Sequence, residues 1–169
     1  MSTSDAVVCL ANGGARLSAI VPDTPDYEAF SAALGTVCTS MAQALVRDGE
    51  GATKFIEITV DGAVSPSAAR TIARSIAASQ LCKTAFFGSD PNWGRIACAA
   101  GYAGIPFDPH RLGVWIGDLQ VLDGGARVAY AEEDAAARMK ERDVKVRVSV
   151  GEGPGACVFW TSDLSYDYV

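Results

Sequence analysis

Two short segments of the chain hold the residue types and spacings that could do chemistry. In the first, Asp48-Gly-Glu-Gly-Ala-Thr-Lys54, a carboxylate (Glu50) and an ammonium (Lys54) follow a predicted helix. Glycines on both sides of Glu50 permit positive φ angles and close approach of a ligand to the backbone. Such a pair could grip the ammonium and carboxylate of an amino acid. Spacing alone leaves the alternative open that this is a glycine helix stop with solvated charges.

The second segment is Gly88-Ser-Asp-Pro-Asn-Trp-Gly-Arg95. Its Asp-Pro-Asn sequence predicts a turn, and Asp90 or Asn92 can cap the helix expected to follow. Beside Gly94, a large ring (Trp93) and the forked donors of Arg95 would project from the start of that helix. Arg95 is therefore a second candidate for contact with a substrate. The alternative is a capped turn that Trp93 anchors in the core.

Other common catalytic arrangements are hard to build from this sequence. The chain has one histidine, His110, in a predicted loop that would face solvent, and no serine lies in a Gly-x-Ser-x-Gly elbow. A Ser-His-Asp or Cys-His enzyme is therefore not expected. The glycine-rich segment 151–155 leads from one predicted strand into another. We expect a hairpin-like loop there and no phosphate site, because a phosphate loop needs a helix N-terminus.

Composition argues against several classes of partner. The net charge is −6 and no stretch is strongly basic, so we expect no nucleic-acid partner. We expect no membrane partner, because no apolar stretch approaches membrane-spanning length, and the polar start of the chain is not a signal peptide. The five cysteines are odd in number and lack C-x-x-C spacing. They predict neither a disulfide framework nor a metal site, and favour a reducing intracellular compartment.

The elements that must position these residues are short helices and strands of an α+β domain without internal repeats or linkers. Several strands alternate in polarity and turn tightly, which favours sheets covered by helices on one face over a buried parallel sheet. Helices are predicted over 27–46, from Ser65-Pro66 onward, over 93–103 and over 132–142. Strands are predicted over 6–10, 55–60, 83–87, 114–116, 119–122, 127–130, 144–150 and 156–161.

Five segments together resemble the β-chain of the ornithine acetyltransferases, the glutamate N-acetyltransferases of arginine biosynthesis. They follow the family's order and spacing and extend over the whole chain. They are Ser2–Asp5 with Val7–Leu10 and Asn12-Gly13, Asp48–Lys54, Lys83–Gly88, Asp90–Arg95 and Asp163–Val169. The resemblance implies a layered sandwich of mainly antiparallel or mixed sheets with flanking helices, as in self-processing N-terminal-nucleophile enzymes. It also implies an assembly of two α/β pairs.

The resemblance further implies a mechanism. Members of this family cut their own chain before a threonine, which becomes the nucleophile at the start of the β-chain. Its α-amine can serve as the base, so no histidine is required. The threonine takes the acetyl group of N-acetylornithine, and glutamate then accepts it, while the α-chain supplies the oxyanion hole. No cofactor is implied, although acetyl-coenzyme A could serve as a donor substrate.

The cleavage threonine of the family would lie well before Ser2, so we expect no catalytic residue within residues 1–169. Thr3 lies in a different motif and is not its equivalent. The family's tail after Tyr168-Val169 and its whole α-chain would also lie outside this sequence. We therefore expect residues 1–169 to be a partial β-chain that is inactive alone.

One family site can be carried over: the glutamate of the Gly-Glu-Gly-Ala motif binds substrate in the family, and Glu50 occupies its position. Its expected role is to hold the substrate's α-ammonium. Contacts of Lys54 or Arg95 with substrate are our inference from the residues. The enzyme would be cytoplasmic in a bacterium and organellar in a eukaryote. A related self-processing aminopeptidase, or a non-enzymatic interaction module, are the alternatives.

Overall fold

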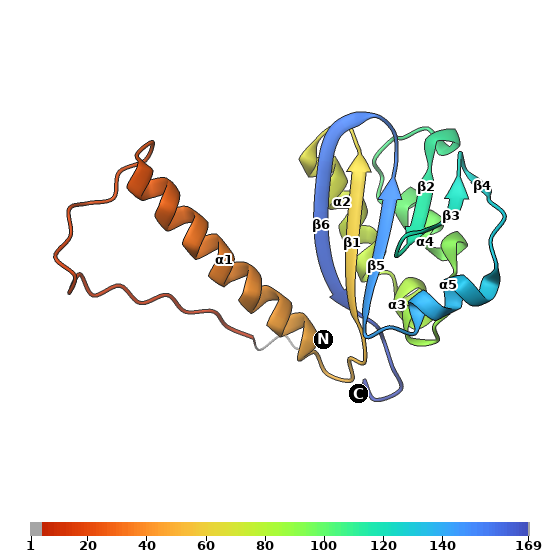
Figure 1. Cartoon of the computed structure of the whole chain (residues 1–169), viewed down its shortest axis with the longest axis horizontal. Coiled ribbons are helices and arrows are strands. Elements are labelled where there is room, and N and C mark those ends of the chain that lie inside the picture. The colour runs from red at the N-terminus through yellow and green to blue at the C-terminus, as the bar shows by residue number, and fades with distance from the viewer. Residues whose placement is uncertain (1–4, 169) are drawn as a thin grey trace.

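The computed structural model describes residues 5–168, and Ser2, Thr3 and Ser4 of the first motif lie outside them. The strands of the described part form a six-stranded sheet in the order β4-β3-β2-β5-β1-β6 (Figure 1). The strands are β1 (Phe55–Gly62), β2 (Gly113–Ile116), β3 (Leu119–Asp123), β4 (Ala126–Arg127), β5 (Asp143–Ser149) and β6 (Gly153–Ser162). The helices are α1 (Pro25–Arg47), α2 (Pro66–Ala78), α3 (Gln80–Phe87), α4 (Trp93–Gly101) and α5 (Glu132–Met139), with a 3-10 turn at Pro109–Arg111.

The sheet is mixed, and β1 lies next to its edge strand β6. β1 pairs in parallel with β5 and antiparallel with β6, and the remaining pairs are antiparallel. Alternate residues of β1, namely Ile56, Ile58 and Val60, are fully buried, as the period of two in a strand requires. The apolar faces of α2 and α4 join these side chains in one core. The predicted α+β class, with a mixed sheet and flanking helices, is confirmed.

Two helix starts agree with the capping residues predicted from the sequence. The side chain of Ser65 accepts a hydrogen bond from the backbone N–H of Ala68, and α2 begins at the following proline. The side chain of Asn92 accepts from the N–H of Arg95 and caps α4. These interactions are local in sequence, which explains why residue types alone could predict them.

Two predicted strands are absent from the described part of the chain. Residues 6–10 are exposed and pair with no strand there. Residues 83–87 form most of α3, which Ser79 caps by accepting from the N–H of Cys82. A short apolar run is compatible with a strand or a buried helix face, and here Cys82 and Phe86 are buried one helical turn apart. The strand prediction for 83–87 was therefore wrong.

The hairpin-like loop predicted over 151–155 is also wrong, because β5 and β6 do not pair. They flank β1, so the chain crosses over the end of β1 between them. At this crossing, backbones pack against each other without side chains. A Cβ on Gly62 would lie 2.1 Å from the carbonyl oxygen of Gly151, and one on Gly153 would lie 2.1 Å from that of Ala63. The glycines are needed for this close approach.

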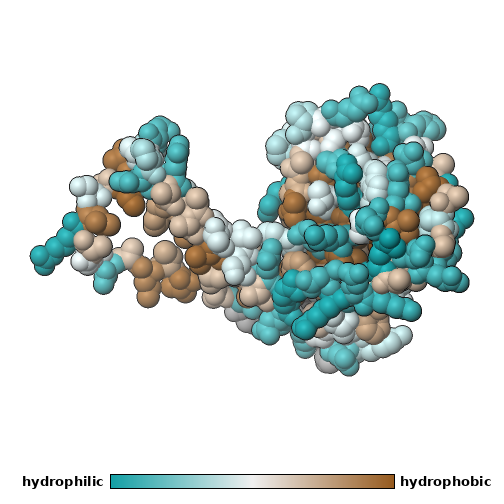
Figure 2. All heavy atoms as spheres, viewed as in Figure 1, coloured by the Kyte–Doolittle hydropathy of each residue, from teal (hydrophilic) through white to brown (hydrophobic). Residues whose placement is uncertain are grey.

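Helix α1 and the extended segment before it project from the body of the protein (Figures 1 and 2). No residue of α1 is buried. One side of α1 carries an apolar stripe of exposed residues, Tyr27, Phe30, Leu34, Val37, Met41 and Leu45. At 3.6 residues per turn, polar residues such as Glu28, Thr36 and Gln43 fall on the opposite side. The helix ends at Arg47, whose guanidinium forms two hydrogen bonds of 2.6 and 2.7 Å with Asp143.

Helix α1 bears on the expectation that no apolar stretch reaches membrane-spanning length. Among residues 5–168, Pro25–Arg47 is one helix that is long and apolar enough to cross a membrane. That expectation was therefore too strict. Core helices of soluble proteins meet the same criteria of length and composition. A single apolar stripe with polar residues opposite is typical of a helix that packs against protein.

Candidate functional site

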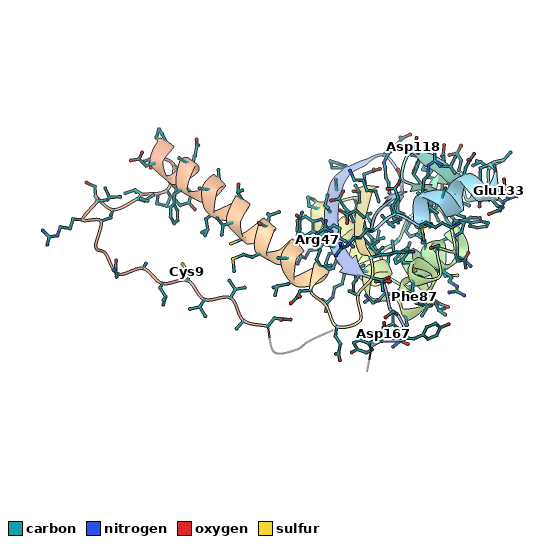
Figure 3. The ribbon with its side chains drawn as sticks, turned by 60° about the horizontal axis from the view of Figure 1, so that its bottom comes forward. Cys9, Arg47, Phe87, Asp118, Glu133 and Asp167 are labelled. Atoms are coloured by element: carbon teal, nitrogen blue, oxygen red, sulfur yellow. The ribbon has the colours of Figure 1, made fainter. Side chains whose placement is uncertain are left out.

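The first candidate segment, Asp48–Lys54, connects the end of α1 to the start of β1. Here it meets the end of β6, the end of α3 and the segment that follows β6. Figure 3 shows Phe87 and Asp167 close together at this end of the protein. The ring of Phe87 contacts Tyr166 edge to face, with centroids 5.3 Å apart. Three segments distant in the sequence therefore meet at the loop that carries Glu50.

The Glu50 side chain is exposed, and within residues 5–168 no hydrogen bond or ion pair engages its carboxylate. The backbone beside it is fixed. Gly51 has φ +65°, and a Cβ there would lie 2.7 Å from the backbone nitrogen of Tyr168. The hydroxyl of Ser165 donates a hydrogen bond of 2.5 Å to the Gly51 carbonyl. A fixed backbone thus presents a carboxylate that remains open to a cationic ligand.

Asp163, at the end of β6, holds the other half of the same loop. It is only 3% exposed. One carboxylate oxygen accepts from the backbone N–H groups of Thr53 and Lys54, at 2.8 and 2.9 Å. The other accepts from the Thr53 hydroxyl at 2.5 Å. Sequence reasoning missed this residue, although a carboxylate placed directly after an apolar strand was a usable signal.

Lys54 is engaged within the chain. Its ammonium donates to the carbonyl of Phe86 at 2.6 Å, to the hydroxyl of Ser89 at 2.7 Å and to the carbonyl of Met139 at 2.7 Å. Phe86 and Met139 lie at the C-terminal ends of α3 and α5, where carbonyls lack helical partners and attract positive charge. Burial lowers the pKa of Lys54, and the charge of Asp163 partly opposes this. A contact with substrate would require one of these bonds to break, and it stays a prediction.

A second lysine, Lys83 on α3, is buried next to the end of β6. Its ammonium donates to the hydroxyls of Thr161 and Ser162, at 3.2 and 3.3 Å, and to the Ser162 carbonyl. Burial lowers the pKa of Lys83, again opposed by the charge of Asp163. Lys83 was not among the candidate site residues, and residues 83–87 were expected to form a strand.

Arg95 makes its contacts in a different part of the protein, between α4 and α3. Its guanidinium donates to the carbonyl of Leu81 at 2.9 Å and to the hydroxyl of Thr84 at 3.3 Å, which ties α4 to α3. Within the described residues, no hydrogen bond connects it to Asp48–Lys54. The structure thus brings Glu50, Lys54, Lys83 and Asp163 together and places Arg95 outside that network. Its contact with a substrate stays a prediction too.

A cavity of about 300 Å³ opens beside this network, between α1, α2 and β6. Asp48 and Gly49 of the loop, Arg74 of α2, and Trp160, Thr161 and Ser162 of β6 are among the residues that line it. Cavities of roughly 300–1,000 Å³ hold small molecules in proteins. A compound of amino-acid size would therefore fit beside the loop that carries Glu50. No three His, Cys, Asp or Glu side chains of residues 5–168 are placed to share a metal ion.

The chain is similar to proteins of one family over its whole length. The model of the ArgJ family matches residues 1–169. The arginine biosynthesis bifunctional protein ArgJ of Symbiobacterium thermophilum is 45% identical over 168 residues, which are 99% of this chain and 42% of that protein. ArgJ 1 of Nostoc sp. is 46% identical over 99% of this chain and 43% of its own length. The chloroplastic ArgJ of Physcomitrium patens is 43% identical over 99% of this chain and 34% of that protein.

A solved structure has the same fold. The crystal structure of arginine biosynthesis bifunctional protein argJ from Bacillus halodurans superposes with a TM-score of 0.92 at 41% sequence identity. The match covers 99% of this chain and 79% of that chain. The chain spans less than half the length of the curated relatives described above. From the match over all 169 residues, the chain belongs to the ArgJ family.

Proposed function

We propose that this chain is part of the β-chain of a glutamate N-acetyltransferase of arginine biosynthesis, where it supplies part of the substrate site. The support is family membership, together with relatives named as bifunctional proteins of arginine biosynthesis. The observation that carries the proposal is the exposed Glu50 carboxylate, held on a fixed loop beside a cavity of suitable size.

The proposed reaction proceeds in two transfers. A threonine hydroxyl outside this chain attacks the acetyl carbonyl of N-acetylornithine, the carbon–nitrogen bond breaks, and the departing nitrogen takes up a proton. The amine of glutamate then attacks the acetyl-threonine ester and frees the hydroxyl. An oxyanion hole from the α-chain stabilises both tetrahedral intermediates. The reaction needs no cofactor, and acetyl-coenzyme A is a further possible donor.

The position of the acetyl group in the donor determines which of its nitrogens Glu50 can bind as a cation. In N-acetylornithine the acetyl group occupies the α-nitrogen, so the cation available to a carboxylate is the side-chain ammonium. We therefore propose that Glu50 accepts a charge-assisted hydrogen bond from that ammonium, instead of the α-ammonium first expected. This contact would lie away from the reacting carbonyl and would fix the orientation of the donor.

The proposed partners are the α-chain of the same precursor and a second α/β pair. The apolar stripe of α1 supports a protein partner, because contiguous exposed apolar surface usually marks an interaction site. The location proposed is the cytoplasm in bacteria or an organelle in eukaryotes, in keeping with bacterial relatives and a chloroplastic plant relative. The isolated chain should release no ornithine from N-acetylornithine and glutamate. Turnover that survives further purification would contradict the placement of the nucleophile outside this chain.

The test is replacement of Glu50 in the complete enzyme. Loss of one partner from a desolvated charged pair costs roughly 2–5 kcal/mol. At about 1.4 kcal/mol per factor of ten, kcat/KM for N-acetylornithine should fall about 30-fold to a few thousand-fold in Glu50→Ala. Glu50→Gln should be milder, because an amide oxygen still accepts a hydrogen bond. Self-cleavage, checked on a gel, should be spared.

Glu152→Ala is the matched control. Glu152 also lies between two glycines, but at the opposite end of the sheet, where it pairs with Arg111 at 3.1 Å. Its replacement should leave the kinetics unchanged. Near-normal kinetics for Glu50→Ala would contradict the proposed substrate contact.

A further inference from the structure

Asp163 is the residue that connects the end of β6 to the loop carrying Glu50. Three hydrogen bonds reach its two carboxylate oxygens, all of them from Thr53 and Lys54. These residues follow Glu50 by three and four positions, and only Gly51 and Ala52 intervene. Because glycine has a wide range of backbone conformations, such a loop needs an external contact to keep one shape. Asp163 supplies that contact on the C-terminal side of Glu50.

The charge of Asp163 acts on two lysine ammonium groups. It partly opposes the lowering of the pKa of Lys54 and of Lys83, and the buried side-chain polar atoms of the described residues all have hydrogen-bond partners. The lysines in turn hold the ends of α3, α5 and β6. The loop is therefore tied to the end of β6 through the Asp163 carboxylate and to α3 and α5 through the Lys54 ammonium, while the Lys83 ammonium ties α3 to β6.

From this arrangement we propose that Asp163 is a positioning residue for Glu50: its carboxylate fixes the loop so that Glu50 faces the substrate ammonium. Asp163 itself is buried and touches no substrate. This inference rests on the proposed function, because it requires that Glu50 binds the donor. Asp163 was not among the candidate site residues, and its role follows from contacts between residues far apart in the sequence.

The test separates positioning from plain structural support through the kinetic parameters of the complete enzyme. A remote contact that binds substrate and transition state equally changes KM and leaves kcat unchanged when it is lost. Asp163→Ala should therefore raise KM for N-acetylornithine about tenfold or more, since small misplacements in a site have effects of this size. The kcat per active site, counted by titrating the nucleophilic threonine, should stay within about twofold on the same grounds.

Two milder variants keep the test decisive if Asp163→Ala does not fold. Thr53→Val removes only the hydroxyl that donates to Asp163 and should raise KM by about threefold, which is about half of a tenfold loss on the logarithmic scale. Asp163→Asn keeps the shape but removes the charge, and should also raise KM. Asp61→Asn is the matched control, because Asp61 lies at the other end of β1 and pairs with Arg147 at 2.6 Å. It should leave KM unchanged.

A double-mutant cycle with Glu50→Ala gives the final discrimination. If Asp163 acts through Glu50, Thr53→Val or Asp163→Asn should have little further effect on KM when Glu50 is already alanine. Additive effects, or a loss of kcat at constant KM, would overturn the positioning role while the Glu50 contact stands. Normal kinetics of Glu50→Ala alone would instead overturn the proposed function and this inference with it.

Discussion

The two ends of strand β1 are held in opposite ways. At the Phe55 end, side chains fix the neighbouring segments: Asp163 accepts from backbone N–H groups, and Lys54 and Lys83 donate to carbonyls and hydroxyls. At the Gly62 end, backbone packs directly on backbone, and a Cβ on Gly62 or Gly153 would overlap a carbonyl group. A Gly-Glu-Gly sequence occurs at both ends, around Glu50 and around Glu152.

This difference separates two meanings of the same sequence pattern. At the Gly62 end the glycines are needed because the neighbouring backbone leaves no space for a Cβ atom. Glu152 at this end is an exposed residue paired with Arg111. At the Phe55 end Gly51 is needed for its positive φ and its contact with the C-terminal segment, and the carboxylate between the glycines is left available. At the Phe55 end, contacts between side chains and backbone can hold a functional group in a defined position. At the Gly62 end, the glycines allow the chain to cross closely over the end of β1.

The largest effect should come from Gly62→Ala. The new Cβ would lie 2.1 Å from a backbone carbonyl, and the φ of +73° is unfavourable for any residue with a Cβ. Backbone cannot yield as a flexible side chain can, so we expect a loss of about 3 kcal/mol or more in the free energy of unfolding. Urea denaturation of the complete enzyme would measure it. Gly35→Ala, in open space on α1, is the control and should stabilise the protein by up to about 1 kcal/mol.

Asp163→Ala should be the next largest. It leaves the N–H groups of Thr53 and Lys54 without their acceptor, and each unsatisfied buried donor costs about 1–3 kcal/mol. The free energy of unfolding should fall by roughly 2–4 kcal/mol in the same urea titration. An unchanged midpoint would show that water or a neighbouring group replaces the carboxylate, and that the Phe55 end does not depend on it.

Lys83→Met tests the buried ammonium through pH. Burial lowers the folded-state pKa of Lys83 below its ordinary value of 10.5, so between the lowered pKa and 10.5 the unfolded chain binds more protons. The contribution of Lys83 to the free energy of unfolding should therefore rise with pH across that window. Urea midpoints from pH 7 upward should show wild type gaining stability relative to Lys83→Met. A difference independent of pH would mean that the pKa is not lowered.

The smallest effect on stability should come from Glu50→Gln. The side chain is exposed and has no partner within residues 5–168, and surface substitutions of this kind usually change the free energy of unfolding by less than about 0.5 kcal/mol. Its effect on kinetics should nevertheless exceed that of the Glu152→Ala control. A marked loss of stability would identify Glu50 as a structural residue and weaken the contrast between the two ends of β1.

The features that could be predicted from the sequence are those with local causes. Ser65 and Asn92 cap helices through neighbours three residues away, and Ile56, Ile58 and Val60 alternate because a strand has two faces. Glu50 was found because its flanking glycines are adjacent in sequence. These signals do not depend on the rest of the fold.

The features that were missed depend on tertiary contacts. Asp163 lies 110 residues from Thr53, so its hydrogen bonds could not be inferred from spacing. Lys83 lies in a short apolar run that is compatible with either a strand or a helix. In the structure the run is helical, and Phe86 is buried in the core. The role of Lys54 at two helix ends needed the positions of α3 and α5, which no local pattern contains.

The position of β1 between β5 and β6 has a consequence for the order of folding. Both of its neighbours, β5 and β6, come from residues 143–162, at the C-terminal end of the chain. During synthesis β1 and α2 leave the ribosome long before either strand exists to pair with them. Pairings between residues distant in the sequence are slow to form. Until they form, the unpaired edges of β1 favour aggregation. We therefore expect refolding to be limited by the docking of β5 and β6 on β1, with chaperones protecting the nascent N-terminal half.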